Sequence, residues 1–227
     1  MIITIDGPAA SGKSSVAQAL ASRLGCYYLY TGLLYRAFAY LLKNKYGVQI
    51  SQIVTCIGPC VVQEDDLTMI ESIDYSYDDG KPQITIDGRK VTEELYQSDI
   101  DQLASIISAN KMVRERLLPL QRRVGKKYDI VADGRDCGSV VFPDADYKFY
   151  LTASLDVRAK RLVSDAKRKN GDMNVEKIRE ELEVRDQRDT QREVAPLRVP
   201  EGATVIDNSA LTKDDTLQEF LHYINDL

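Results

Sequence analysis

Short apolar runs alternate along this chain with longer stretches whose apolar residues recur at helical spacing. Residues 2–5 form a β-branched run that predicts a strand, and residues 13–24 carry apolar side chains three or four positions apart, which predicts a helix. Further strands are predicted at 128–132, 147–151 and 203–206. Strands that alternate with helices indicate a three-layer α/β/α fold around a central parallel five-stranded sheet.

Helical periodicity covers most of the remaining chain, over residues 33–45, 99–124, 154–169, 174–192 and 213–225. The middle of the chain differs, because polar and apolar residues alternate strictly over 73–77 and 83–86. The turn sequences Asp78-Asp79-Gly80-Lys81 and Asp87-Gly88 follow these runs. We therefore expect a small antiparallel β subdomain inserted over about 62–97.

Length and charge narrow the function classes. The chain has 227 residues, enough for one α/β domain with inserts, and a net charge of −5, which argues against a nucleic-acid-binding protein. No apolar run approaches 18 residues and no leader-like segment precedes the first strand, so we expect a cytoplasmic protein without a membrane partner. The four cysteines show no paired zinc spacing.

A phosphate-binding loop joins the first strand to the first helix. Residues 7–14 match G-x-x-x-x-G-K-[ST], and this context directs backbone N–H groups and the positive end of a helix at one anion. Lys13 can then reach the β- and γ-phosphates of ATP, and Ser14 can ligate Mg²⁺ together with ATP phosphates and water. The predicted ATP-binding residues are Gly7, Pro8, Ala9, Ala10, Ser11, Gly12, Lys13, Ser14 and Ser15.

Two arginines are well placed to bind a second phosphate group, in addition to the phosphates of ATP. Arg36 lies one turn into a helix, and Arg135 follows a buried strand inside Asp133-Gly134-Arg135-Asp136. A guanidinium binds phosphate oxygens through two parallel N–H groups, and ligands of such folds lie beyond the carboxyl ends of the strands. A structural Arg–Asp pair within this tetrapeptide is an equally weighted alternative.

Five further arginines lie on two consecutive helices. Arg185, Arg188 and Arg192 have i, i+3, i+7 spacing and share one helical face, and Arg158 and Arg161 form an i, i+3 pair on the preceding helix. One such pair usually belongs to a solvated surface. All five together predict a lid that closes over polyphosphate and neutralises the charge on the transferred group.

These motifs together resemble the bacterial-type cytidylate (CMP/dCMP) kinases of the P-loop nucleoside monophosphate kinase family. The resemblance extends over nearly the whole chain, and its order and spacing are more specific than the phosphate loop alone. The segments that carry it are 7–14, Thr31-Gly32 with Tyr35-Arg36, 130–136, 140–145, 185–189 and 192–197. It implies transfer of the γ-phosphoryl group of ATP to CMP or dCMP with Mg²⁺, by a monomer that serves pyrimidine nucleotide metabolism.

The resemblance also implies a role for each matching residue. Arg36 and Arg135 hold the CMP phosphate; Ser105, Arg114 and Asp136 recognise cytosine; Arg185 and Asp189 contact the sugar hydroxyls. Thr31, Tyr35 and Asp133 complete the implied CMP site, although Asp133 equally suits a structural pair or a water of Mg²⁺. The implied catalytic residues are Lys13, Arg135, Arg158, Arg161, Arg188 and Arg192. Tyr30 departs from the acid that is common in the family.

The expected organisation is a single kinase domain with three parts. The core comprises 1–31, 125–155 and 195–227, the monophosphate-binding region with its insert comprises 32–124, and the arginine-rich lid comprises 156–194.

Other functions stay open at this point. A kinase for UMP, AMP or shikimate has the same loop, and a P-loop regulatory switch or a nucleic-acid-dependent ATPase also binds nucleotide. Arg36 and Arg135 argue against a switch, because a switch lacks a second phosphate site. The sequence does not separate CMP from dCMP. Stimulation of ADP release by CMP distinguishes the kinase from the other two classes.

Overall fold

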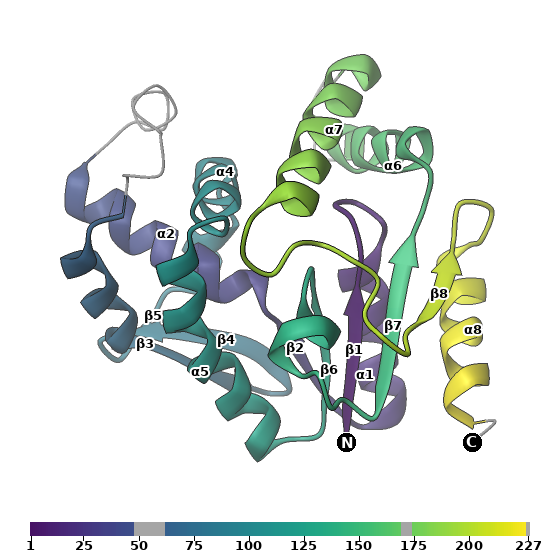
Figure 1. Cartoon of the computed structure of the whole chain (residues 1–227), viewed down its shortest axis with the longest axis horizontal. Coiled ribbons are helices and arrows are strands. Elements are labelled where there is room, and N and C mark those ends of the chain that lie inside the picture. Colours follow the sequence, from purple (N-terminus) through teal and green to yellow (C-terminus); the bar gives the residue numbers. More distant parts are fainter. Residues whose placement is uncertain (48–61, 169–173, 226–227) are drawn as a thin grey trace. The chain divides into compact units, whose positions relative to one another are not determined.

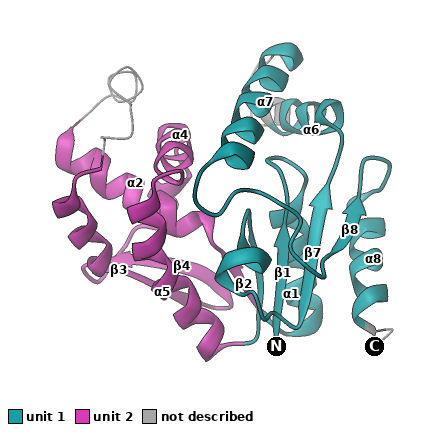
Figure 2. Ribbon diagram, in the orientation of Figure 1, with its two compact units in different colours: residues 1–26, 129–227 teal, residues 27–128 magenta. Residues whose placement is uncertain are grey.

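The computed structural model of the chain describes residues 1–47, 62–168 and 174–225 (Figure 1). The chain divides into two units, which Figure 2 colours separately. Unit 1 comprises residues 1–26 and 129–227, and unit 2 comprises residues 27–128. The predicted division into core, monophosphate-binding region and lid stays a prediction.

A parallel sheet forms the centre of unit 1. Strand β1 (Ile2–Asp6) lies between β6 (Ile130–Gly134) and β7 (Tyr147–Thr152), and β8 (Thr204–Asp207) follows β7. With β2 (Tyr27–Tyr30) the strand order is β2-β6-β1-β7-β8, which confirms the predicted five-stranded sheet. The pairing of Asp6 with Gly134 and Tyr150 brings the carboxyl ends of three strands to one edge.

Apolar side chains bury this sheet. Ile3 and Ile5 on β1 have no solvent exposure, and neither have Ile130 and Val131 on β6. Phe149 of β7 packs against Phe220, with 4.6 Å between the ring centroids. Phe220 belongs to helix α8 (Lys213–Asn225), which packs against α1 (Lys13–Leu24). The helical periodicity of both segments is thus explained by one buried face each.

Helices α6 (Leu155–Arg168) and α7 (Val175–Gln191) pack against each other in unit 1. Their shared core consists of Ala159, Val163, Ile178 and Leu182, and it includes Ala9 of the phosphate loop. The two arginine-bearing helices are therefore anchored on the loop by apolar contacts, independently of any charge.

Unit 2 contains a small antiparallel sheet and several helices. The sheet has the order β3-β4-β5, which confirms the predicted insert with its tight turns. The elements are α2 (Gly32–Tyr46), η1 (Glu64–Ser72), β3 (Ile73–Asp78), β4 (Lys81–Ile86), β5 (Arg89–Lys90), η2 (Glu93–Tyr96), α4 (Ser98–Ile107) and α5 (Lys111–Lys127).

Two helices account for the helical periodicity over 99–124, since α4 ends at Ile107 and α5 begins at Lys111. Asn110 lies between them in an extended conformation, and its side-chain oxygen accepts a hydrogen bond of 3.2 Å from Val113 N. An asparagine in this position caps a new helix and stops the previous one from continuing.

A π-helical turn, η3 (Cys137–Val141), follows β6 and was not predicted. Its defining bonds run from Val141 N to Asp136 O at 3.1 Å and from Phe142 N to Cys137 O at 2.7 Å. Such turns are rare and occur often at functional sites. This one directly follows Asp136, a predicted substrate contact.

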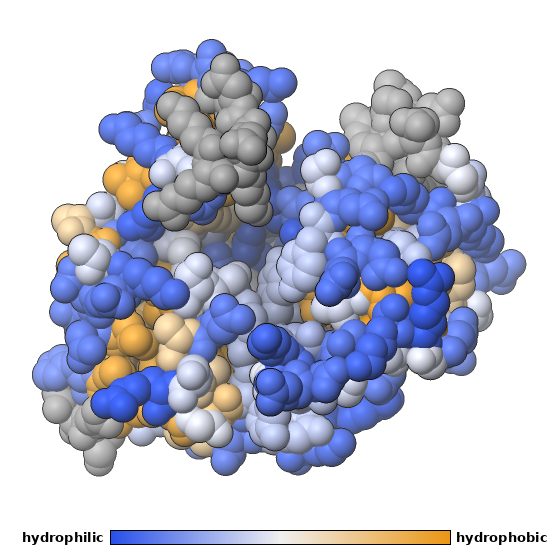
Figure 3. Space-filling model, turned by 180° about the vertical axis from the view of Figure 1, so that it is seen from behind, coloured by the Kyte–Doolittle hydropathy of each residue, from blue (hydrophilic) through white to orange (hydrophobic). Residues whose placement is uncertain are grey.

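Hydrophilic residues dominate the face of the molecule shown in Figure 3. Within the described part of the chain, no helix has the length and the apolar composition that crossing a membrane requires.

Replacing Gly7 by alanine should destabilise the protein far more than replacing Gly25. Both glycines have positive φ, +151° and +69°, but a Cβ on Gly7 would lie 2.0 Å from the carbonyl oxygen of Leu151, whereas a Cβ on Gly25 meets nothing within 4 Å. We expect Gly25→Ala to cost about 1–2 kcal/mol of unfolding free energy and Gly7→Ala to cost at least about 3 kcal/mol or to prevent folding. Equal losses in urea denaturation would contradict this close approach.

Candidate active site

The phosphate loop is held together partly by its own lysine. Lys13 is 5% exposed, and its Nζ donates to the carbonyl oxygen of Pro8 and, at 3.3 Å, to Ser11 Oγ. Gly12 has φ +92°, a conformation that favours glycine, and Ala10 adopts φ +59°. The loop predicted from the sequence is therefore built as a compact turn between β1 and α1.

An oxygen-rich pair lies at the start of α1. Ser14 Oγ donates a hydrogen bond of 2.6 Å to Asp133 Oδ2, which joins the loop to the end of β6. A hydroxyl and a carboxylate in contact suit Mg²⁺, which prefers oxygen ligands and keeps several waters. Among the described residues there is no cluster of three or more acidic, histidine or cysteine side chains that could hold a metal ion. The ion would thus use few protein oxygens.

Two arginines of α6 contact the loop backbone. Arg158 Nη1 donates to Ala9 O at 3.0 Å, and Arg161 Nη1 donates to Ser11 O at 3.3 Å. Asn208, which follows β8, accepts from Arg161 through both its side-chain and backbone oxygens and donates to Ser11 O at 3.0 Å. Both arginines therefore lie against the predicted ATP-phosphate loop.

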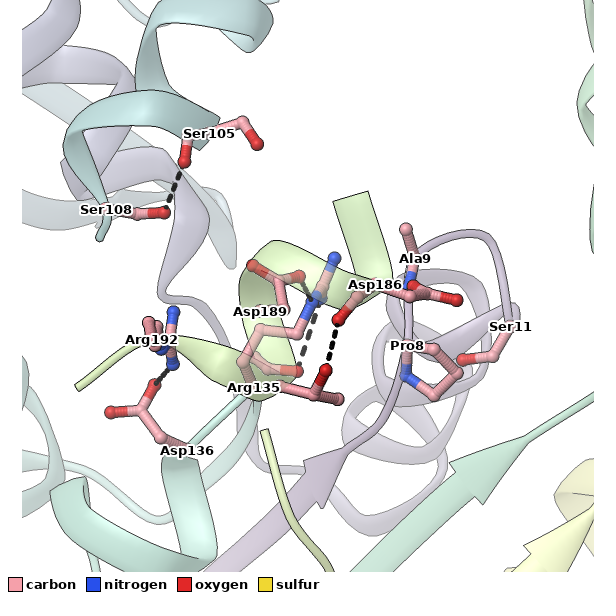
Figure 4. Close-up of polar contacts among 12 residues, drawn as sticks. Pro8, Ala9, Ser11, Ser105, Ser108, Arg135, Asp136, Asp186, Asp189 and Arg192 are labelled. Carbon is pink, nitrogen blue, oxygen red and sulfur yellow. Dashed lines mark hydrogen bonds and ion pairs between the residues drawn. The ribbon is translucent and has the colours of Figure 1, made fainter. Parts of the chain in front are cut away.

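Asp186 of α7 adds a carboxylate to this contact. Its Oδ2 lies 2.7 Å from Arg158 Nη1, and its Oδ1 accepts a long hydrogen bond of 3.4 Å from Ala9 N. Figure 4 shows Asp186 beside Ala9 and Pro8. An ion pair thus reinforces the apolar anchoring of α6 and α7 on the loop.

Arg135 pairs with Asp189. Arg135 Nε lies 2.8 Å from Asp189 Oδ2, and the dashed line in Figure 4 marks this contact. Burial alone would raise the pKa of Asp189, but the charges of Arg135, Arg185 and Arg192 hold that pKa below its ordinary value. Arg135 thus has an ion-pair partner outside residues 133–136, on α7.

Positive charge gathers around Lys13. Burial lowers the pKa of Lys13 well below its ordinary value, and the nearby guanidinium groups of Arg135 and Arg185 lower it further, against the opposing charges of Asp133 and Asp6. Like charges held this close indicate a site that an anion stabilises.

Arg192 lies beside Asp136 rather than at the loop. Its Nη2 is 3.5 Å from Asp136 Oδ1, and its Nε donates to Ala195 O at 2.6 Å. Figure 4 marks the contact between Arg192 and Asp136 with a dashed line. Ala195 has φ +50°, an uncommon conformation for alanine. Of the predicted lid arginines on α7, Arg185 and Arg188 are half-buried within the helix, whereas Arg192 follows its end.

Asp6 is wholly buried at the end of β1. Its two oxygens accept hydrogen bonds of 2.7 Å from Cys137 N and 2.8 Å from Gly138 N. Burial raises the pKa of Asp6 to about 7, the neighbouring Asp136 also raises it, and the two N–H donors and Lys13 partly oppose the increase.

In unit 2, Arg36 is held by several partners. Its Nη1 donates to Leu95 O at 2.9 Å, its Nη2 lies 2.5 Å from Asp101 Oδ1, and its guanidinium lies 5.7 Å from the centre of the Tyr96 ring. Burial opposes its charge, but Tyr30 and Asp101 raise the pKa of Arg36. Tyr30 thus contacts Arg36 from the position where the family commonly has an acid.

The other predicted contacts of unit 2 form a second group. Arg114 Nη1 donates to Ser108 O at 2.9 Å, and the Arg114 guanidinium lies 5.4 Å from the centre of the Tyr35 ring. Ser105 O accepts from Ser108 Oγ at 2.8 Å in the same turn. Thr31 is buried at the start of α2. Arg114 of α5 therefore lies against Tyr35 of α2, and Ser108 links it to the turn that contains Ser105.

Sequence reasoning missed four residues that build these sites: Asp6, Asp101, Asp186 and Asn208. Two of these residues could have been found from the sequence, because Asp6 ends strand β1 and Asn208 directly follows strand β8, and the carboxyl ends of both strands border the site. Asp186 lies inside the segment 185–189 that was already singled out. Asp101 has no local signal, since its contact with Arg36 spans 65 residues.

Comparison with known proteins identifies close relatives. The family model described as "Cytidylate kinase" matches residues 3–226. Similar proteins named cytidylate kinase include those of Thermotoga neapolitana, at 37% identity over 99% of this chain and 96% of the relative, and Methylococcus capsulatus, at 39% identity over 98% and 96%. An uncharacterised protein from Eubacterium ventriosum has a similar fold, with a TM-score of 0.54, 14% identity and coverage of 100% of this chain and 99% of that one.

The stability of the protein should depend on pH through Asp6. Because its folded-state pKa is raised from 3.8 to about 7, the folded state binds a proton more tightly than the unfolded chain does. The tighter binding of this proton adds to the free energy of unfolding, and the addition is complete below about pH 4. It is lost as the pH rises to about 7, and the total loss is at most about 4 kcal/mol. The difference in unfolding free energy between the wild type and Asp6→Asn should fall across this window. A flat or rising difference would contradict the raised pKa.

Proposed function

This chain belongs to the cytidylate kinase family, and from that premise we propose how its own residues carry out the reaction. The protein transfers the γ-phosphoryl group of ATP to CMP or dCMP, which gives ADP and CDP or dCDP. The observation that carries the proposal is the set of cations held at the phosphate loop: Lys13 Nζ donates to Pro8 O, Arg158 Nη1 to Ala9 O and Arg161 Nη1 to Ser11 O. Cations gathered in this way suit a polyanion such as the phosphates of ATP.

The donor phosphates bind at the loop formed by residues 7–15. Lys13 and the loop N–H groups face the β- and γ-phosphates, and Arg158 and Arg161, which contact Ala9 O and Ser11 O, flank them. Arg188 adds charge from α7. The chief effect of these cations is electrostatic, because the transferred group spreads negative charge over its oxygens in the transition state.

Mg²⁺ binds near Ser14 and Asp133, whose contact of 2.6 Å places a hydroxyl and a carboxylate together. When bound, the ion would neutralise phosphate charge. Ser14 and Asp133 would hold it, Asp133 directly or through a water, and Asp133 is thus assigned to the ion in preference to CMP.

The proposed acceptor residues are assigned within each unit separately. In unit 1, Arg135 holds the CMP phosphate, Arg185 and Asp189 contact the sugar, and Asp136 recognises the base. The pairing of Arg192 with Asp136 supports a role for Arg192 beside the acceptor instead of the predicted role over the polyphosphate. In unit 2, the proposed acceptor residues are Thr31, Tyr35, Arg36, Ser105 and Arg114.

The chemistry needs no strong base. The attacking oxygen of the CMP phosphate is already anionic, so it can attack the γ-phosphorus in line with the departing ADP oxygen. The chain has a single histidine, His222 on α8, outside all the motifs of the site. Catalysis then comes from positioning and from charge stabilisation by Lys13 and the arginines.

We also propose that the protein acts as a cytoplasmic monomer on small molecules. A net charge of −5 is unfavourable for binding nucleic acid, and the predicted site draws its residues from one chain.

Arg135→Ala should lower kcat/KM for CMP roughly 100- to 1,000-fold, because one charge-assisted phosphate contact is lost at the reacting group. Its circular dichroism spectrum should match that of the wild type. Arg89→Ala serves as the matched control, since Arg89 is an arginine with a 72% exposed side chain that pairs with Glu94 on the surface. If Arg135→Ala retained wild-type kcat/KM, Arg135 would not hold the acceptor.

Asp136→Ala should weaken discrimination among bases. A lost hydrogen bond to a charged group corresponds to roughly a 10- to 100-fold smaller preference for CMP over UMP and AMP. The preference is measured as the ratio of kcat/KM values. Asp144→Ala, which removes an exposed carboxylate nearby in the sequence, should keep the wild-type ratio. If Asp136→Ala kept the wild-type preference for CMP over UMP and AMP, Asp136 would not be the residue that recognises cytosine.

A further inference from the structure

One buried carboxylate holds two neighbouring backbone N–H groups in unit 1. Asp6 Oδ1 accepts from Cys137 N at 2.7 Å, and Asp6 Oδ2 accepts from Gly138 N at 2.8 Å. Both donors lie in the first turn of η3, where the helix itself provides no acceptors. A carboxylate offers an acceptor oxygen to each of them, which an amide or a hydroxyl cannot do.

The segment held by Asp6 also fits tightly against β1. A Cβ added to Gly138 would lie 2.7 Å from Thr4 Oγ1 and 3.4 Å from Asp6 Oδ2. Just before this glycine, the carbonyl oxygen of Asp136 accepts from Val140 N at 2.9 Å and from Val141 N at 3.1 Å. The backbone after Asp136 is therefore fixed by β1 and by its own π-turn.

Asp136 is thus placed between two rigid elements. β6 ends two residues before it, and the segment fastened by Asp6 follows it directly. Its carboxylate faces Arg192 at 3.5 Å. Because hydrogen bonds are directional, a small rotation of this backbone would move the carboxylate away from a bound base.

We propose that Asp6 is a positioning residue for acceptor recognition: by binding the N–H groups of Cys137 and Gly138, it directs the carboxylate of Asp136 at the base of the acceptor. This inference rests on the proposed role of Asp136. A residue needed only for stability would reduce the amount of folded enzyme, and the preference between bases would stay the same. Asp6 instead affects selectivity, although it touches neither substrate.

The test is Asp6→Asn in the full chain, with steady-state kinetics at temperatures where circular dichroism shows each variant folded. The asparagine amide accepts from one N–H group and directs its own NH₂ at the other. We expect the preference for CMP over UMP to fall at least tenfold, with a higher KM for CMP and a KM for ATP within twofold of the wild type. An unchanged preference, or equal effects on both substrates, would overturn the proposal.

Asp66→Asn is the matched control. Asp66 of unit 2 is another carboxylate without solvent exposure, and it accepts a hydrogen bond of 2.8 Å from Gln63 N. The same chemical change at this site should lower stability and leave the base preference intact. A comparable loss of preference in Asp66→Asn would mean that destabilisation alone explains the effect, which would overturn the proposal.

The double variant Asp6→Asn/Asp136→Ala tests the route of the effect. If Asp6 acts through Asp136, adding Asp6→Asn to Asp136→Ala should change the base preference less than twofold, and additive losses would contradict this route.

The single variants separate the two proposals. If Asp136→Ala relaxes the preference and Asp6→Asn does not, the present proposal alone fails. If Asp136→Ala leaves the preference unchanged, the assignment of Asp136 fails and takes this proposal with it. If Asp6→Asn does not fold, Gly138→Ala replaces it, because this change displaces the same backbone. The same losses in base preference and the same KM values are then expected of Gly138→Ala.

Discussion

The site depends on the parallel pairing of β1 with β6 and β7. This pairing places Asp6 beside Gly134 and Tyr150, so the phosphate loop and the segment 133–136 emerge at one edge of the sheet. The strands are held there by buried apolar side chains such as Ile3, Ile5 and Phe149. Gly7 then lets the loop turn away at a point where any side chain would collide with Leu151 O. The positions of the charged groups thus follow from apolar packing.

The charges at this edge are organised as pairs of opposite sign that leave a positive centre. Asp186 faces Arg158, Asp189 faces Arg135, and Asp136 faces Arg192. Removing one partner of such a buried pair leaves a desolvated charge, so each pair resists separation. Burial and the nearby cations lower the pKa of Lys13, and in the proposed reaction phosphate supplies the opposing negative charge. The same residues therefore hold the site together and give it a positive charge that suits anions.

Local pattern was sufficient to predict β1, β6, β7 and β8, the phosphate loop, the antiparallel insert and the arginine-bearing helices, because each is encoded by periodicity or turn residues within a few positions. The break at Asn110 was missed because helical periodicity continues on both sides of it. The π-turn after Asp136 has no periodicity of its own and is fixed by Asp6, more than 130 residues earlier. The partner of Arg192 was likewise set by a contact across 56 residues, which spacing along α7 cannot reveal.

The central claim, that this sheet edge transfers phosphate from ATP to a cytidine monophosphate, is tested most directly by acceptor-dependent ADP release from Mg-ATP. The acceptors to compare are CMP, dCMP, UMP, AMP, GMP, dTMP and shikimate, each against a reaction without acceptor. The account predicts turnover with CMP and dCMP well above that with every other acceptor, and little ADP release without one. Turnover only with a different acceptor, or ADP release that no acceptor stimulates, would contradict it.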